Sequence, residues 1–165
     1  MGKTEENLWA AFAGESQANR KYLAFANKAE KDGYPQAAKL FRAAAHAETV
    51  HAHAHLRALK AIGDTRDNLR AAMEGELHEF EEMYPPMIET AKAEGNKAAE
   101  MSFTFAHKVE KTHAELYRQA LENLDNLPET DYYVCQVCGH TEDGDSAPDK
   151  CVVCGANSRA FSKIS

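Results

Sequence analysis

Apolar residues recur at helical spacing through most of the chain, in four long segments that are rich in helix-forming residues. Gly33, Gly63 and Gly95 separate these segments, as expected for residues that end helices. Inside the third segment, the pair Pro85-Pro86 predicts a kink. We therefore expect four helices, at about 4–31, 34–62, 65–94 and 96–126.

The last part of the chain has a different character. After a short linker that contains Pro128, the sequence from Asp131 is rich in Gly and Asp, and Tyr132–Val134 is its only clear strand pattern. Each of the four helices predicted before this segment is long enough to span the length of a four-helix bundle. The expected fold class is therefore an all-α four-helix bundle over residues 1–127, followed by a small β and loop domain over residues 131–165.

Acidic and imidazole side chains interrupt the apolar stripe of every predicted helix near its middle. A carboxylate on a buried face is costly unless it is paired or bound to a cation. No Lys or Arg lies on the stripes, so ion pairs do not explain these positions. The interrupting residues are Glu15, Glu48, His51, Glu76, Glu79, Glu110 and His113.

The spacing of these residues indicates a metal site. Six of the seven form three pairs three positions apart, so both side chains of a pair point the same way on a helix. Together they offer five carboxylates and two imidazoles. Hard oxygen donors with a minority of imidazole suit two iron or manganese ions bridged by carboxylates.

The remaining histidines fit the stripes less well. His53 lies about 200° from His51 around a helix and should face solvent. His78 and His107 also fall off the stripes and are predicted to lie at the surface. His55 shares the stripe of His51, and we expect it to be a buried neighbour of the site rather than a ligand.

All four cysteines lie near the C-terminal end, in two Cys-x-x-Cys-Gly sequences separated by 12 residues. Four thiolates at this spacing predict a tetrahedral metal site. The cysteines alone favour structural zinc over iron, whereas a redox-active bundle in the same chain favours iron. The four predicted ligands are Cys135, Cys138, Cys151 and Cys154.

Composition and charge narrow the class of protein. The chain has 165 residues, of which 44% are hydrophobic and 27% charged, as in soluble globular proteins. A formal charge of −7 argues against a nucleic-acid surface. No segment is apolar enough to span a membrane, and the polar N-terminus lacks a signal-peptide core, so we expect a cytoplasmic protein.

Four stretches of sequence and the C-terminal cysteines are similar to those of the rubrerythrin family, and the resemblance covers essentially the whole chain. The stretches are AGESQA at 13–18, AETVH at 47–51, GELHEFEEMYP at 75–85 and EKTH at 110–113. The resemblance implies a ferritin-like bundle that holds two irons, followed by a rubredoxin-like domain that holds one iron on four cysteines, with zinc as a substitute metal.

The same resemblance implies a role for each ligand. Glu48 and Glu110 would bridge the two irons. Glu79 and His113 would be terminal ligands of one iron, and Glu15 of the other.

In this family the second iron changes one ligand with redox state. The matching residues are Glu76 in the oxidised site and His51 in the reduced site, which makes Glu76 the expected proton relay. Tyr22 and Tyr84 match tyrosines that lie beside the cluster, and Tyr22 is expected to be catalytic. An ordinary role as core tyrosines accounts for both residues equally well.

The activity that the resemblance implies is a peroxidase-type oxidoreductase, which reduces hydrogen peroxide to water in oxidative-stress defence. Electrons would come from an upstream donor, a rubredoxin or an NAD(P)H-dependent reductase, through the four-cysteine iron. The alternative is a ferroxidase for iron storage or detoxification, but such a protein has no need of an electron-transfer domain. A zinc-stabilised scaffold is a third interpretation.

The connection between the second and third helices predicts a homodimer. In ferritin-like bundles these helices run parallel, so the connection must return the length of the bundle. If His51 and Glu76 bind the same metal site, they lie at the same height along the bundle axis, and residues 63–67 must span ~28 Å. Five fully extended residues reach only ~17 Å. We therefore expect a helix-swapped dimer, in which two chains complete each bundle.

Overall fold

The computed structural model describes residues 2–165, which form two compact units. The first unit ends at Gly63, and the second spans Asp64–Ser165. No helix in the described part of the chain combines the length and the apolar character that a membrane span requires.

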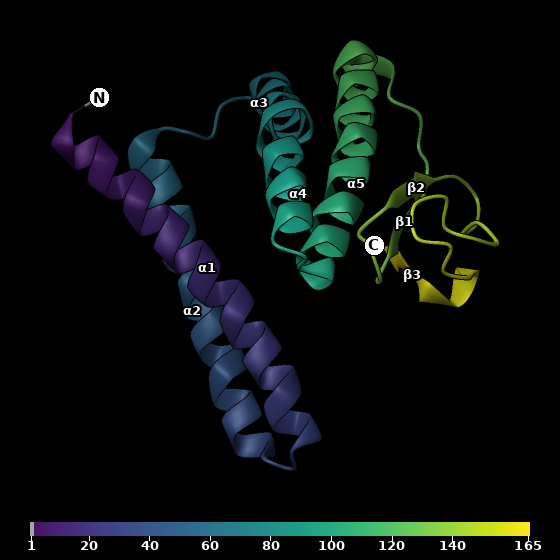
Figure 1. Ribbon diagram of the computed structural model, residues 1–165. Helices are drawn as coiled ribbons and strands as arrows, with labels where there is room; N and C mark the ends of the chain where they lie inside the picture. Colours follow the sequence, from purple (N-terminus) through teal and green to yellow (C-terminus); the bar gives the residue numbers. More distant parts are fainter. Residues whose placement is uncertain (1) are drawn as a thin grey trace. The chain divides into compact units, whose positions relative to one another are not determined.

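The first unit is a hairpin of two helices, α1 (Lys3–Lys31) and α2 (Pro35–Leu59), which lie side by side (Figure 1). Gly33 reverses the chain between them with a φ of 82°, a conformation that favours glycine. We expected α2 to reach Ile62, but it ends at Leu59. The reason is that Lys60 adopts a left-handed conformation and its N–H bonds to the carbonyl of Arg57, which closes the helix.

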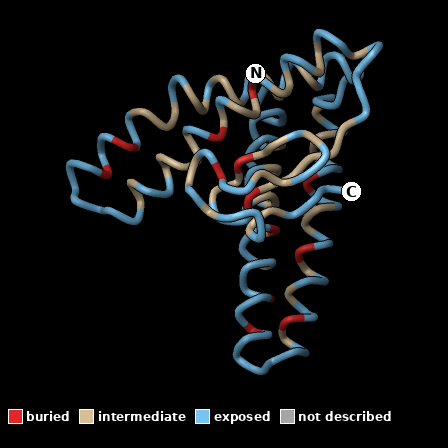
Figure 2. The backbone as a smooth tube through the Cα atoms, turned by 90° about the vertical axis from the view of Figure 1, so that its right-hand side faces the viewer, coloured by how far each residue is buried: buried red, intermediate tan, exposed pale blue. Residues whose placement is uncertain are grey.

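Small residues allow α1 and α2 to approach closely. Asn19 of α1 is buried and donates hydrogen bonds from Nδ2 to the carbonyl of Ala45 at 2.7 Å and to Oγ1 of Thr49 at 2.9 Å. Tyr22 and Phe41 are only half-buried. The other buried positions of this unit, red in Figure 2, are all alanines: Ala26, Ala29, Ala38, Ala45 and Ala52.

The second unit begins with helices that pack against one long helix. The elements α3 (Thr65–His78), η1 (Glu79–Met83) and α4 (Tyr84–Ala93) follow one another without a break and lie against α5 (Lys97–Glu122) (Figure 1). Asp64 caps α3 by accepting a hydrogen bond from the N–H of Asp67, and Asn96 caps α5 by accepting one from Ala99.

A π-helical turn, η1, interrupts the third predicted helix just before the expected kink. The N–H of Tyr84 donates to the carbonyl of Glu79, five residues back rather than four. Pro85 and Pro86 follow directly, and a proline lacks an N–H and clashes with the carbonyl four residues before it. The distortion therefore falls on the turn that precedes the prolines.

The C-terminal part of the second unit is a three-stranded antiparallel sheet with the order β2-β1-β3. We expected a strand only at 132–134. The other two strands are short and show no apolar alternation, because β2 contains only polar residues and the two apolar residues of β3 stand at its ends. Backbone pairing with β1 holds both strands. The elements are η2 (Leu124–Asn126), β1 (Tyr132–Cys135), β2 (Thr141–Asp143), η3 (Ser158–Ala160) and β3 (Phe161–Ile164).

Candidate metal centres

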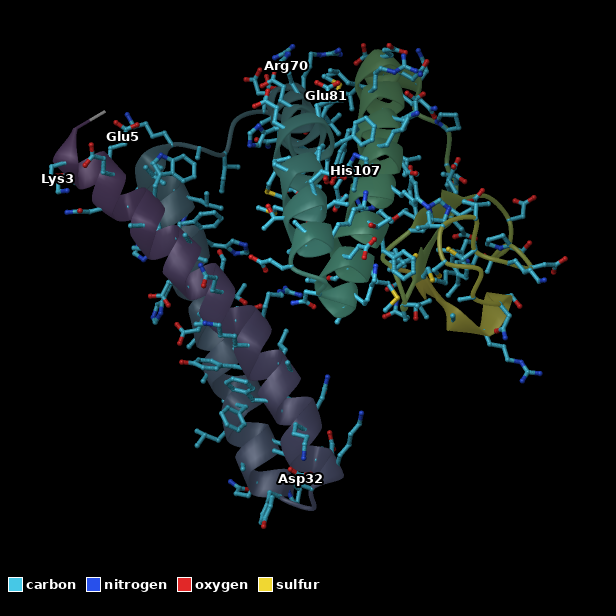
Figure 3. The ribbon with its side chains drawn as sticks, viewed as in Figure 1. Lys3, Glu5, Asp32, Arg70, Glu81 and His107 are labelled. Carbon is cyan, nitrogen blue, oxygen red and sulfur yellow. The ribbon has the colours of Figure 1, made fainter. Side chains whose placement is uncertain are left out.

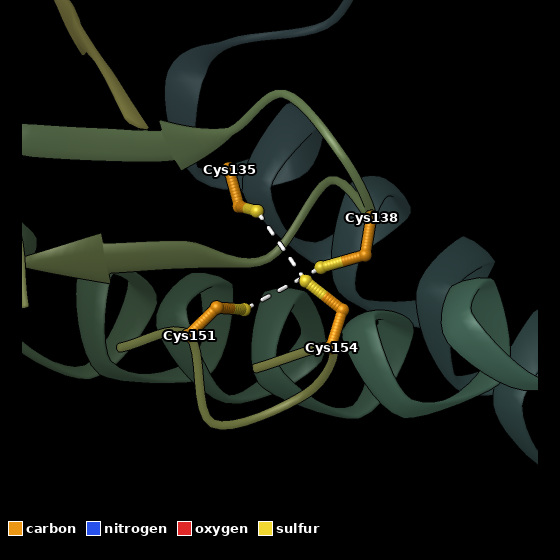
Figure 4. Close-up of side chains that lie close together, drawn as sticks. All are labelled: Cys135, Cys138, Cys151 and Cys154. Carbon is orange, nitrogen blue, oxygen red and sulfur yellow. Dashed lines mark hydrogen bonds between the residues drawn. The ribbon is translucent and has the colours of Figure 1, made fainter. Parts of the chain in front are cut away.

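The four cysteine side chains converge on one point (Figure 4). Sγ of Cys135 lies 3.7 Å from Sγ of Cys154, and Sγ of Cys138 lies 3.5 Å from Sγ of Cys151. All four sulfur atoms lie within 4.8 Å of one another, and none is in a disulfide. Four converging sulfurs without disulfides are the ligand set of a tetrahedral zinc or iron site.

The two Cys-x-x-Cys-Gly sequences adopt the same turn. Gly139 and Gly155 have φ values of 85° and 76°, and their N–H groups donate to the carbonyls of Cys135 and Cys151 at 2.8 and 2.9 Å. Burial raises the pKa of the Cys138 thiol, and a hydrogen bond from the backbone of His140 opposes this by favouring the thiolate. A bound cation would supply the remaining stabilisation that a buried thiolate needs.

The first unit contains one group of acidic and imidazole side chains. Glu15 of α1 and Glu48 and His51 of α2 place one ligand atom each within 4.8 Å of the others. Nδ1 of His51 lies 3.0 Å from Oε2 of Glu48 and 3.8 Å from Oε1 of Glu15. The Glu48 side chain is the least exposed of the three, at 17%.

The second unit contains a matching group. Glu76 of α3 and Glu110 and His113 of α5 also lie within 4.8 Å of one another. Nδ1 of His113 lies 2.9 Å from Oε2 of Glu110 and 3.7 Å from Oε1 of Glu76. Burial, opposed by the charge of His113 and aided by Glu110, raises the pKa of Glu76 to about 7. Burial likewise raises the pKa of Glu110.

Glu79 and Tyr84 lie close to this second group. Glu79, in η1, is outside the set of three, but its charge contributes to the raised pKa of Glu110. Burial first, and then the charges of the glutamates, raise the pKa of the Tyr84 hydroxyl. Tyr84 therefore keeps its proton at neutral pH.

Tyr22 lies in an aromatic cluster of the first unit. Its ring centroid is 6.3 Å from that of Phe41 and 6.4 Å from that of Phe25. This position fits the interpretation of Tyr22 as a core tyrosine, and the catalytic role that the family resemblance implies stays a prediction.

The positions of the other histidines correct one prediction. His53 and His78 are exposed, as predicted, and His55 is half-buried outside the group of Glu15, Glu48 and His51. His107, labelled in Figure 3, was predicted at the surface but is half-buried, with its ring stacked on Phe80 at 4.7 Å. The apolar periodicity of the helix does not predict this burial, because His107 lies off the apolar stripe, on a part of α5 that packs against η1.

Thr141 is a residue of this region that no sequence pattern indicated. It begins β2, and its Oγ1 lies 2.9 Å from Nε2 of His113. A pocket of about 440 Å³ opens beside Glu76, His113 and Thr141. A single threonine in a Gly- and Asp-rich segment carries no periodic signal, so only the folded chain reveals this contact.

The residues present fit both kinds of metal. Four thiols that converge without disulfides suit iron or zinc. Each of the two clusters of glutamates and a histidine offers mostly oxygen donor atoms. Within each cluster, the ion pairs join the glutamates to the imidazole of His51 or His113. Such oxygen-rich sets with one imidazole each suit iron or manganese.

Comparison with known protein families matches both parts of the chain. Residues 6–121 match the rubrerythrin family, and residues 133–162 match the rubredoxin-like domain of rubrerythrin. These matches confirm the predicted fold class, a four-helix bundle followed by a small sheet with a four-cysteine cluster.

Individual relatives match over nearly the full length. Rubrerythrin-2 of Clostridium acetobutylicum is 35% identical, with 96% of this chain and 95% of the relative covered. Nigerythrin of Nitratidesulfovibrio vulgaris is also 35% identical, with 93% and 83% covered. A solved structure of fully reduced, all-ferrous nigerythrin is 34% identical with a TM-score of 0.60, and the match covers 99% of this chain and 88% of that chain. This chain therefore belongs to the rubrerythrin family.

Proposed function

We propose that this protein is a non-haem di-iron peroxide reductase that converts hydrogen peroxide to water. The observation that carries the proposal is the combination of two carboxylate and imidazole groups with a four-cysteine site in one chain. Membership of the rubrerythrin family and the all-ferrous state described for nigerythrin support iron as the metal.

Seven side chains would hold the two irons of the bundle. We assign the bridging positions to Glu48 and Glu110, whose side chains are the least exposed of the two groups, at 17% and 13%. Iron at these sites would supply the two electrons that cleave the O–O bond, and iron on the four cysteines would return them. The remaining proposed ligands are Glu15, His51, Glu76, Glu79 and His113.

Reduction of peroxide to two waters also consumes two protons. We assign the proton relay to Glu76, because its carboxyl group lies beside His113 and lines the 440 Å³ pocket through which protons can enter from solvent. Tyr84, which keeps its proton and feels the charges of Glu79 and Glu110, is proposed as a hydroxyl group beside the site. Tyr22 is proposed as the corresponding hydroxyl of the first unit.

An external electron donor must reach the four-cysteine site. Val137 and Val152, the residues inside the two cysteine turns, are 59% and 79% exposed. We propose that a rubredoxin or an NAD(P)H-dependent reductase docks on this apolar surface, because the exposed valines lie directly beside the cysteines.

We further propose that two copies of the chain complete each bundle. His51 lies eight residues before the end of α2 and Glu76 eleven residues after the start of α3, so a connection within one bundle must span ~28 Å. The five residues Lys60–Asp64 reach only ~17 Å when fully extended. In a swapped dimer the connection runs between bundles and this conflict disappears.

Reconstitution with ferrous iron followed by visible spectroscopy tests the function. The air-oxidised protein should show thiolate-to-iron charge-transfer bands that bleach with a reductant and return when hydrogen peroxide is added. If peroxide is consumed no faster than in buffer with free iron, the proposed activity is wrong. Rapid oxidation by dioxygen with retention of many irons per chain would instead support the ferroxidase alternative.

A variant without the cysteine site gives the matched control. Cys151→Ser with Cys154→Ser removes the two sulfurs of the turn that does not carry Thr141 and changes none of the proposed carboxylate and imidazole ligands. The chemically reduced variant should still react once with peroxide, but it should not turn over with an external donor. Full turnover by this variant would contradict the proposed path of electrons.

A further inference from the structure

His113 joins the carboxylate group of the second unit to the cysteine-bearing domain. Its Nδ1 lies 2.9 Å from Oε2 of Glu110, and its Nε2 lies 2.9 Å from Oγ1 of Thr141. Thr141 is 28 positions further along the chain and belongs to β2 of the sheet. One imidazole ring therefore contacts both parts of the unit.

Thr141 offers His113 a hydrogen-bond acceptor. Its hydroxyl can donate to the carbonyl of Gly139, 3.4 Å away, which leaves the threonine oxygen free to accept from Nε2–H of His113. In that tautomer Nδ1 carries no proton, and its lone pair faces the carboxylates of Glu110 and Glu76. Such an arrangement is favourable when a cation lies between the lone pair and the carboxylates, as at a metal site.

The cysteine turn holds Thr141 in place. Gly139 directly follows Cys138, and a Cβ on Gly139 would lie 4.0 Å from Cγ1 of Val109, one turn of α5 before His113. His140, between Gly139 and Thr141, is only 4% exposed. The segment from Cys138 to Thr141 is therefore packed on α5 and held by the same turn that positions the cysteine sulfurs.

We propose that Thr141 is a positioning residue, which holds His113 in the Nε2–H tautomer and presents Nδ1 to the metal at the carboxylate group. The inference rests on the proposed function in one respect, the assignment of His113 as a ligand. Ligating histidines in general donate their second N–H to a fixed acceptor, and loss of that acceptor weakens metal binding by about 10- to 100-fold. The cysteine domain thus contributes to the affinity of the other metal site.

Three variants of the full-length protein test this proposal. Thr141→Val keeps the size and shape of the side chain but cannot accept a hydrogen bond. Thr141→Ser keeps the hydroxyl and tests whether it is sufficient. Thr130→Val is the control, because this threonine, just before the domain, does not contact His113. Each variant is loaded with one zinc at the cysteines, checked by circular dichroism, and titrated with ferrous iron under anaerobic conditions.

We expect Thr141→Val to bind ferrous iron about 10- to 100-fold more weakly, while Thr141→Ser and Thr130→Val stay within about threefold of the parent protein. In nitrogen-15 NMR of His113 before iron is added, the fraction of the Nε2–H tautomer should be larger in the parent and in Thr141→Ser than in Thr141→Val, because only Thr141→Val leaves Glu110 as the sole acceptor for the imidazole proton. Unchanged affinity and tautomer in Thr141→Val would overturn the proposal, as would failure of Thr141→Ser to restore them.

The NMR measurement separates this inference from the proposed function. If the parent protein shows the Nε2–H tautomer and Thr141→Val loses it, but no iron binds at the carboxylates, the contact is real and the di-iron assignment is wrong. If iron binds and peroxide is reduced equally well in Thr141→Val, the function stands and the positioning role is wrong.

Discussion

At the scale of single residues, the cluster of glutamates and a histidine in the second unit buries carboxylates. Burying their charge costs free energy, which a bound metal cation would offset. The side chains of Glu76 and Glu110 are only 22% and 13% exposed, and burial raises both pKa values. Burial is the main cause of both shifts, and the charge of the neighbouring Glu110 adds to the rise in the pKa of Glu76. Without metal, these residues favour protonation over charge.

This arrangement predicts a pH dependence for protein whose carboxylate site is free of metal. Folded Glu76 keeps its proton up to a pKa of about 7, whereas the unfolded chain releases it near 4.5. Between these values the folded state binds more protons, so the free energy of unfolding should fall as pH rises. Urea unfolding at several pH values measures this slope.

Glu76→Gln should remove most of that slope and raise the free energy of unfolding at pH 8 by about 1 kcal/mol, because no charge is then buried. Glu81→Gln, a change at an exposed residue of the adjoining turn, is the matched control and should leave the slope in place. The assignment to Glu76 is refuted if both variants keep the slope of the parent protein.

At the scale of elements, a backbone turn and a buried polar residue set the positions of the proposed ligands. The π-helical turn η1 carries Glu79 and directly precedes the two prolines in the first turn of α4, which cannot donate N–H groups to the carbonyls of that turn. In the first unit, Asn19 hydrogen-bonds to the carbonyl of Ala45 and the hydroxyl of Thr49, next to Glu48. This pair of hydrogen bonds connects α1 and α2 at the level of the metal-binding group.

Asn19→Ala should therefore destabilise the helix hairpin. Two hydrogen bonds of a buried amide are lost, and we expect the free energy of unfolding to fall by about 1–2 kcal/mol. Asn27→Ala on the same helix is exposed and should change it by less than about 0.5 kcal/mol. Urea unfolding followed by circular dichroism measures both, and equal effects of the two variants would contradict the role of Asn19.

At the scale of the whole molecule, the length of the connection decides how many chains make one metal site. Each of the two units contains one cluster of glutamates and a histidine, and the five residues Lys60–Asp64 connect the units. In the proposed swapped dimer, formation of the di-iron site and dimerisation would be a single event. Metal binding should depend on protein concentration.

Mixing two inactive variants tests the swapped dimer. Glu48→Ala damages the group of the first unit and Glu110→Ala that of the second. Co-refolded as an equal mixture, swapped dimers that contain one chain of each kind have one intact site, so about a quarter of the parent activity should return. Bundles closed within single chains would leave every site damaged, and the mixture would stay inactive.

Much of the fold follows from local pattern, and the exceptions have identifiable causes. The bounds of α1 and the start of α5 agree closely with the apolar periodicity and the flanking Gly and Asn residues. The predicted end of the last helix at 126 is wrong, because α5 ends at Glu122 and residues Leu124–Asn126 form the separate 3₁₀ turn η2. The end of α2 was misjudged because the left-handed turn at Lys60 has no glycine to mark it. Strands β2 and β3 were missed because they form through backbone pairing with β1 rather than through apolar side chains.

By itself, the sequence determined the four helical segments, the acidic and imidazole residues that share a face, and the grouping of the cysteines. These features depend on spacing within one element or one turn, which helical geometry converts directly into direction. Only the tertiary structure decided that Glu76 lies within reach of Glu110 and His113, that His107 stacks on Phe80, and that Thr141 meets His113. Those contacts join residues far apart along the chain, and they exist only once α3, α5 and the sheet have packed together.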